Sequence, residues 1–185
     1  DDRNAKYAYV RITQFGTNVR EEFVSAVKRI LAENPDIKDI VFDVRGNLGG
    51  DLHQVIEMVD SVADSTEPLV SIRDNEGIHA YGASPDERPA QPMPGDITKG
   101  LACGILIDGR SASASEIYAG SLKELGRCAT IGKGTWRKGS VQRVSPMRDG
   151  TAIKVNEAEY LVGSPTRWTA VQCVGVNPDI DYEAE

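Results

Sequence analysis

The feature that most restricts the fold is a buried strand that leads into a glycine-rich turn and then into a helix. Residues 39–44 are almost continuously apolar, a pattern typical of a strand covered on both faces. Gly46, Gly49 and Gly50 occupy the turn, and residues 52–62 then carry apolar side chains at helical spacing. This succession predicts an α/β architecture of layered β-sheet and helices.

The remaining segments fit the same architecture. Asn18 is predicted to cap a helix, with Glu21 completing a capping-box-like pair. Four prolines in residues 83–100 predict a surface loop. Strands are expected at 6–15, 68–73, 101–107 and, as short pieces, across 129–180, with helices at 18–34 and 111–125.

Composition excludes several functions. The formal net charge is −7 and no run of Lys and Arg exceeds two residues, which argues against nucleic-acid binding. Apolar runs are only as long as a strand, so no membrane span is expected. Cys103, Cys128 and Cys173 match no zinc pattern, and their odd number leaves at least one thiol free. We expect all three to be structural, in a single domain of residues 1–185.

The glycine turn exposes backbone N–H groups that can bind a phosphate or a developing oxyanion. Its spacing differs from the dinucleotide-binding fingerprint, and the segment 132–135 (GKGT) lacks the Ser or Thr that follows Lys in a phosphate-binding loop. Nucleotide binding is therefore disfavoured. A tight turn without function is the alternative.

Three serines precede the predicted helix at 111–125. Ser113 and Glu116 have the spacing of a capping box, so a purely structural role is one interpretation. A hydroxyl at a helix N-terminus is also well placed for nucleophilic attack, because the helix dipole stabilises negative charge there. These observations leave the choice among the serines open.

A nucleophilic serine needs a base. The two histidines, His53 and His79, show no obvious orienting acid in the local sequence, although a fold can supply one. A lysine also serves as a base once its pKa is lowered. Strand alternation predicts that Lys138, Ser140 and Gln142 share one face, which lines a cleft or faces water.

Five segments together resemble the C-terminal processing (tail-specific) serine peptidases. The resemblance covers nearly the whole chain, with the motifs in the order of the family. They are 43–50 (DVRGNLGG), 111–117 (SASASEI), 132–142 (GKGTWRKGSVQ), 149–154 (DGTAIK) and 175–180 (GVNPDI).

The resemblance implies a Clp protease/crotonase-like fold and a Ser–Lys dyad that cleaves polypeptides near their C-termini through an acyl-enzyme. Ser113 matches the nucleophile, Lys138 the general base and Gln142 the residue that orients the base. The remaining implied site residues are Gly49, Gly50 and Ala114 in the oxyanion hole, and Arg45, Glu116 and Thr135 as support. No metal or cofactor is implied. The family setting is exported, in a bacterial periplasm or a plastid lumen, and oligomers are compatible with it.

The chain departs from the family pattern at several positions. Leu48 stands where the family usually has Pro, residues 136–137 (WR) where it has Phe-Gly, and Arg110 where it has a small residue. No PDZ domain precedes the strand at 7–15 in this chain. One rival interpretation is a catalytically degenerate binding module for a peptide or hydrophobic ligand. Another is a crotonase-type enzyme acting on acyl thioesters.

Overall fold

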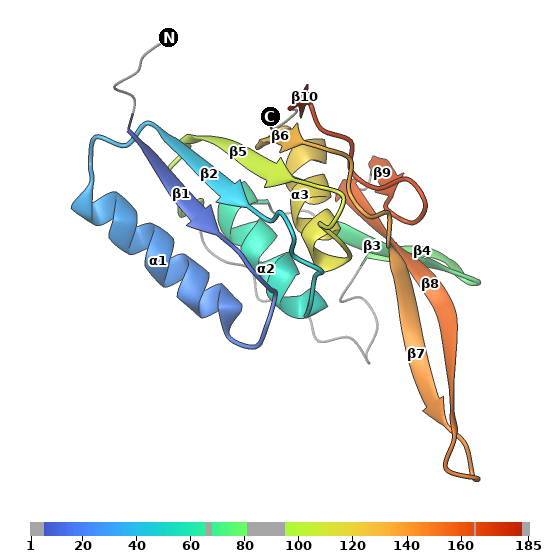
Figure 1. Ribbon diagram of the computed structural model, residues 1–185. Coiled ribbons are helices and arrows are strands. Elements are labelled where there is room, and N and C mark those ends of the chain that lie inside the picture. Colours follow the sequence, from blue (N-terminus) through green and yellow to red (C-terminus); the bar gives the residue numbers. More distant parts are fainter. Residues whose placement is uncertain (1–5, 66–67, 81–94, 165, 183–185) are drawn as a thin grey trace.

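We describe a computed structural model over residues 6–65, 68–80, 95–164 and 166–182 (Figure 1). Its first sheet is entirely parallel, and the strand order is β1-β2-β5-β6-β10. These strands are β1 (Tyr7–Arg11), β2 (Asp39–Asp43), β5 (Ala102–Ile107), β6 (Ala129–Gly132) and β10 (Ile180–Asp181).

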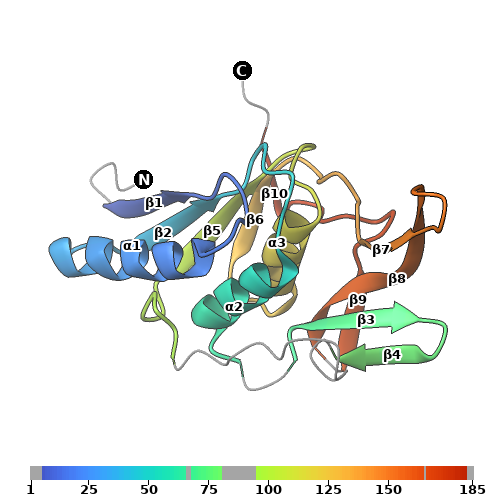
Figure 2. The same cartoon turned by 90° about the horizontal axis from the view of Figure 1, so that it is seen from below.

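Three helices follow strands of this sheet and lie on one side of it (Figure 2). They are α1 (Val19–Glu33), α2 (Leu52–Ala63) and α3 (Ala114–Glu124). Each connection advances the sheet in the same direction, and right-handed crossovers then place all the helices on the same face. The predicted succession of buried strand, glycine turn and helix is β2, the turn at 44–51, and α2.

The second sheet is antiparallel and has the order β4-β3-β8-β7, with β9 paired to β8. Its strands are β3 (Val70–Asp74), β4 (Gly77–Ala80), β7 (Ser140–Pro146), β8 (Ala152–Ser164) and β9 (Arg167–Ala170). Helix α3 lies between the two sheets and contacts β6 and β8. The far end of the β7–β8 hairpin projects away from the rest of the protein (Figure 1).

The core between the first sheet and its helices centres on four aromatic rings. Tyr118 of α3 lies 5.8 Å from Phe42 of β2 and 5.9 Å from Phe15, measured between ring centroids. Phe23 of α1 completes the group at 5.5 Å from Phe42. All four side chains are buried, and the burial of each phenylalanine stabilises the fold by roughly 1.5–3 kcal/mol. Tyr118 therefore fixes the N-terminal half of α3 in the core. The N-terminus of this helix carries the candidate site.

Two local predictions need correction or completion. Asn18 does precede α1, but it adopts a left-handed conformation (φ 66°) and its side chain makes no capping hydrogen bond, so the predicted cap is wrong. Of the segment 83–100, residues 83–94 lie outside the described residues. Ile97 and Thr98 are buried, so this end of the segment packs against the protein and is not merely a surface loop.

The three cysteines form one disulfide and leave one free thiol, in agreement with their odd number. Cys103 and Cys128 form a disulfide that joins β5 to the residue before β6. Cys173 is free and exposed. The disulfide closes a segment that contains α3, so it fastens the two ends of the unit bearing Ser113.

Within the described ranges, no helix is long and apolar enough to span a membrane. The same residues contain no group of three or more His, Cys, Asp or Glu side chains arranged to hold a metal ion.

Candidate active site

Ser113 lies in a sharp turn between β5 and α3. Its backbone angles are φ 58° and ψ −116°, a conformation that a residue with a Cβ rarely adopts and that costs about 1–3 kcal/mol. Ser113 is half-buried, whereas Ser111 and Ser115 are fully buried. Their hydroxyls donate to the carbonyl oxygens of Val44 and Asn47, each at 2.8 Å. The structure thus distinguishes three serines that the sequence left equivalent.

The glycine turn packs directly against Ser113. Gly49 has φ 102°, and a Cβ at this position would lie 2.8 Å from the Ser113 Cβ and 2.9 Å from the Ala114 nitrogen. Only glycine allows this approach. Asn47 holds the two loops together, because its Oδ1 accepts from Gly49 N–H at 2.9 Å and its backbone oxygen accepts from Ala112 N–H at 3.0 Å. The predicted oxyanion-hole residues Gly49 and Ala114 therefore meet at Ser113.

Glu116 joins this turn to a third segment. Its side chain is fully buried, and Oε2 accepts from the backbone N–H groups of Ser113 (2.9 Å) and Lys138 (2.8 Å). Oε1 accepts from the Thr135 hydroxyl and the Arg137 N–H, both at 2.6 Å. The four donors satisfy a buried carboxylate that would otherwise be costly. Glu116 and Thr135 thus hold the backbone of Lys138 beside the Ser113 turn.

The side chains of Lys138 and Gln142 are exposed. Lys138 precedes β7, and the register of β7 against β8 shifts between Val141 and Gln142. Strand β7 begins at Ser140, so regular alternation does not extend to Lys138, and the shared face of Lys138, Ser140 and Gln142 stays a prediction. The Gln142 amide donates to Asn156 Oδ1 at 2.9 Å.

Arg45 supports the end of β2. Its guanidinium donates to both carboxylate oxygens of the buried Asp43, at 3.0 and 2.8 Å, and the Tyr9 hydroxyl donates to the same carboxylate. Burial by itself would raise the pKa of Asp43, but the hydrogen bonds from Arg45 and Tyr9 outweigh it and lower that pKa. The pair with Asp43 in turn raises the pKa of Arg45. This network fixes Arg45 at the start of the glycine turn.

Each histidine has an acidic neighbour in the structure. His53 Nε2 lies 3.2 Å from Glu57 Oε1, one helical turn further along α2. His79 Nε2 lies 3.7 Å from Asp74 Oδ2 across the β3–β4 hairpin. The i, i+4 spacing of His53 and Glu57 was a signal available in the sequence.

The three segments that meet at Ser113 correspond to the motifs at 43–50, 111–117 and 132–142. Residues 6–182 match the sequence profile of Peptidase family S41. The chain belongs to peptidase family S41. In this chain, Ser113 lies at the turn into α3 beside the glycine-rich loop.

Similar S41 proteins include C-terminal processing peptidases. The chain is 33% identical to carboxyl-terminal-processing peptidase 3, chloroplastic, of Arabidopsis thaliana, over 97% of this chain and 32% of that protein. It is also 33% identical to the carboxy-terminal processing protease CtpB of Bacillus subtilis, over 83% of this chain and 30% of that protein. The chain thus spans about a third of the length of these curated relatives.

A solved S41 structure confirms the fold. The photosystem II D1 C-terminal processing protease superposes with a TM-score of 0.80 at 28% identity, covering 96% of this chain and 42% of that chain. The predicted α/β class, with a Clp protease/crotonase-like core, is therefore correct.

Proposed function

We propose that this chain is the catalytic core of a serine endopeptidase that cleaves polypeptides near their C-termini, with Ser113 as nucleophile and Lys138 as general base. The observation that carries the proposal is the strained conformation of Ser113 at the N-terminus of α3, with Gly49 packed against it. Strain of this kind in a half-exposed serine is typical of a nucleophile held for attack.

In the proposed reaction, the neutral Lys138 amine takes the Ser113 hydroxyl proton as the serine oxygen attacks a peptide carbonyl carbon. The carbonyl π electrons move to its oxygen and form a tetrahedral oxyanion. The oxyanion then collapses, the C–N bond breaks, and Lys138 returns the proton to the departing amine. Water hydrolyses the resulting ester of Ser113 and completes the cycle.

Two backbone N–H groups are proposed to bind the oxyanion. The Ala114 N–H and the Gly50 N–H have no acceptor among the described residues, whereas the Gly49 N–H donates to Asn47. Gly49 then contributes by leaving space beside Ser113, and Gly50 is the more available donor of the turn. One such donor lowers the activation barrier by about 2.7–4 kcal/mol.

Lys138 and Gln142 have complementary roles in this proposal. Glu116 holds the backbone of Lys138, which fixes the origin of that side chain near Ser113. The Gln142 side chain orients the Lys138 amine after the hydrogen bond from the Gln142 amide to Asn156 breaks. Thr135 supports Glu116, and Arg45 supports the base of the glycine turn.

The disulfide supports an exported location for this core. Cys103 and Cys128 are bonded, and disulfides persist mainly in oxidising compartments such as a periplasm or an organellar lumen. We propose that residues 1–185 act there as one catalytic domain on polypeptide substrates.

The test is labelling with a fluorophosphonate, followed by peptide mass mapping and a peptide-hydrolysis assay. We expect the adduct on Ser113, and we expect Ser113→Ala and Lys138→Ala each to abolish hydrolysis without unfolding the protein. Ser145→Ala and Lys154→Ala are matched controls, because both residues are exposed on the projecting hairpin.

Full hydrolysis by Ser113→Ala would refute the nucleophile. Retained activity in Lys138→Ala would redirect the search for the base to His53, which pairs with Glu57.

A second candidate function is a binding module with a degenerate site. The hydrogen bond from Gln142 to Asn156 favours this function, because it binds the Gln142 amide to Asn156 and not to Lys138. An absence of both adduct and hydrolysis, combined with measurable peptide binding, would support this alternative.

A further inference from the structure

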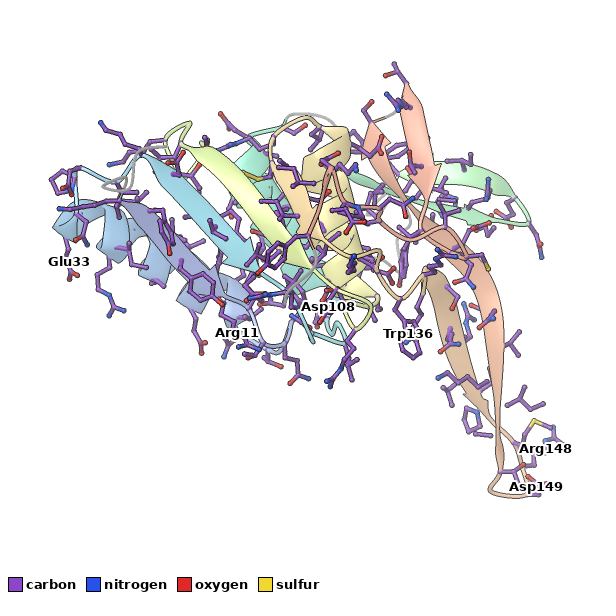
Figure 3. The ribbon with its side chains drawn as sticks, turned by 45° about the horizontal axis from the view of Figure 1, so that its top comes forward. Arg11, Glu33, Asp108, Trp136, Arg148 and Asp149 are labelled. Carbon is purple, nitrogen blue, oxygen red and sulfur yellow. A yellow bond between two sulfur atoms is a disulfide. The ribbon has the colours of Figure 1, made fainter. Side chains whose placement is uncertain are left out.

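Two large apolar side chains stand exposed in the segments that meet at Ser113. Leu48 is 66% exposed and Trp136 is 61% exposed. Figure 3 shows the Trp136 side chain pointing outward from the segment between β6 and β7. Single exposed apolar residues are common on protein surfaces, so exposure alone assigns no role. These two differ because the backbone around each is held rigidly against the Ser113 turn.

Leu48 lies between two residues that are held by hydrogen bonds and packing, Asn47 and Gly49. Asn47 is fully buried and accepts hydrogen bonds from Ala112 N–H and from the Ser115 hydroxyl. A Cβ on Gly49 would lie 2.8 Å from the Ser113 Cβ, so Gly49 packs against the Ser113 turn. The Leu48 Cα is about 3.8 Å from the Gly49 Cα. The turn therefore presents Leu48 to solvent close to the proposed nucleophile.

Trp136 lies on a segment in which five successive backbone N–H groups, those of residues 135–139, all have acceptors. The Trp136 N–H donates to the Ser111 oxygen at 3.0 Å. The next two residues donate to Glu116, and the outer two donate to the Val176 oxygen and to Gln172 Oε1. This indole is therefore attached to a fixed backbone on the other segment that meets the Ser113 turn.

We infer that Leu48 and Trp136 bind apolar side chains of a polypeptide substrate beside the scissile bond. An extended peptide advances about 3.3 Å per residue, so a peptide whose carbonyl lies over Ser113 places its neighbouring side chains near the two loops. Because the backbone that carries both side chains is already held in place, binding to them costs little backbone conformational entropy. The inference rests on the proposed function and adds a substrate class, peptides with Leu-like or aromatic residues at the cleavage position.

The experiment measures peptide binding separately from cleavage. Two dye-labelled octapeptides differ only in the central residue, Leu or Asp, and their Kd values are measured by fluorescence anisotropy with the Ser113→Ala protein. Adding Leu48→Ser or Trp136→Ser should weaken binding of the Leu peptide about tenfold and change binding of the Asp peptide less than about twofold. Trp136→Phe should retain most of the affinity, because it keeps an aromatic ring.

Tyr7→Ser is the matched control, since Tyr7 is 62% exposed at the start of β1, away from the Ser113 turn. Binding should be unchanged in this variant. Equal melting temperatures across the set show that the fold is intact.

The outcomes separate the inference from the proposed function. Unchanged binding of the Leu peptide by both serine variants, or no measurable binding of either peptide, would overturn the inference. If the protein with Ser113 intact still cleaves the Leu peptide in that case, the proposed function stands. Binding that depends on Leu48 and Trp136, without any cleavage, supports the apolar site and refutes the peptidase proposal.

Discussion

Removing the Cys103–Cys128 disulfide should destabilise the protein by a predictable amount. The bond joins residues 25 positions apart. The loop-closure entropy for a loop of that length corresponds to about 3.5 kcal/mol at 25 °C, because the cross-link restricts the unfolded chain. For 185 residues, the entropy of unfolding is about 0.39 kcal/mol/K near the melting temperature. The double variant Cys103→Ser/Cys128→Ser should therefore melt about 9 °C lower.

The assay is thermal and urea unfolding, monitored by circular dichroism, with and without reductant. Reduction of the unsubstituted protein should reproduce the loss seen in the double variant, and reductant should not change the double variant further. Cys173→Ser is the matched control, because this thiol is free and exposed. A melting temperature within about 2 °C of the unsubstituted protein would refute the calculation. It would show that the unfolded chain already holds the two cysteines close together.

Substitutions at three further positions test the contacts around the site. Glu116→Gln should lower the free energy of unfolding by at least about 2 kcal/mol in urea unfolding, because an amide keeps one acceptor oxygen for four donors; an unchanged midpoint would contradict this. Arg137 has φ 74°, so Arg137→Gly should be more stable than Arg137→Ala by about 1 kcal/mol, and equal melting temperatures would contradict it. The lowered pKa of Asp43 stabilises the fold above its unfolded-state pKa of about 3.9, and this contribution is lost as the pH falls through the folded-state pKa. Asp43→Asn should therefore lose less stability between about pH 5 and about pH 3 than the unsubstituted protein, and equal losses would argue against this role.

The sequence predicted the elements that carry the site because their signals are local. The apolar residues at 39–44 and the helical spacing behind them gave β2 and α2. The order of five short motifs identified the family, and the Ser113–Glu116 spacing indicated the contact between the Glu116 carboxylate and the Ser113 N–H. Asn18 failed as a cap because its backbone is left-handed, a property that its side chain does not reveal.

The sequence by itself determined the α/β class, the turn glycines and the family, because each depends on short segments whose residues are neighbours in the chain. Only the tertiary structure decided which serine is accessible, which cysteines pair, and where the Gln142 amide binds. Ser111 and Ser115 are held by carbonyl groups 67 and 68 residues away in the chain. Partners so distant leave no periodicity or spacing in the sequence, and they become neighbours only when β2, β5 and α3 have packed together.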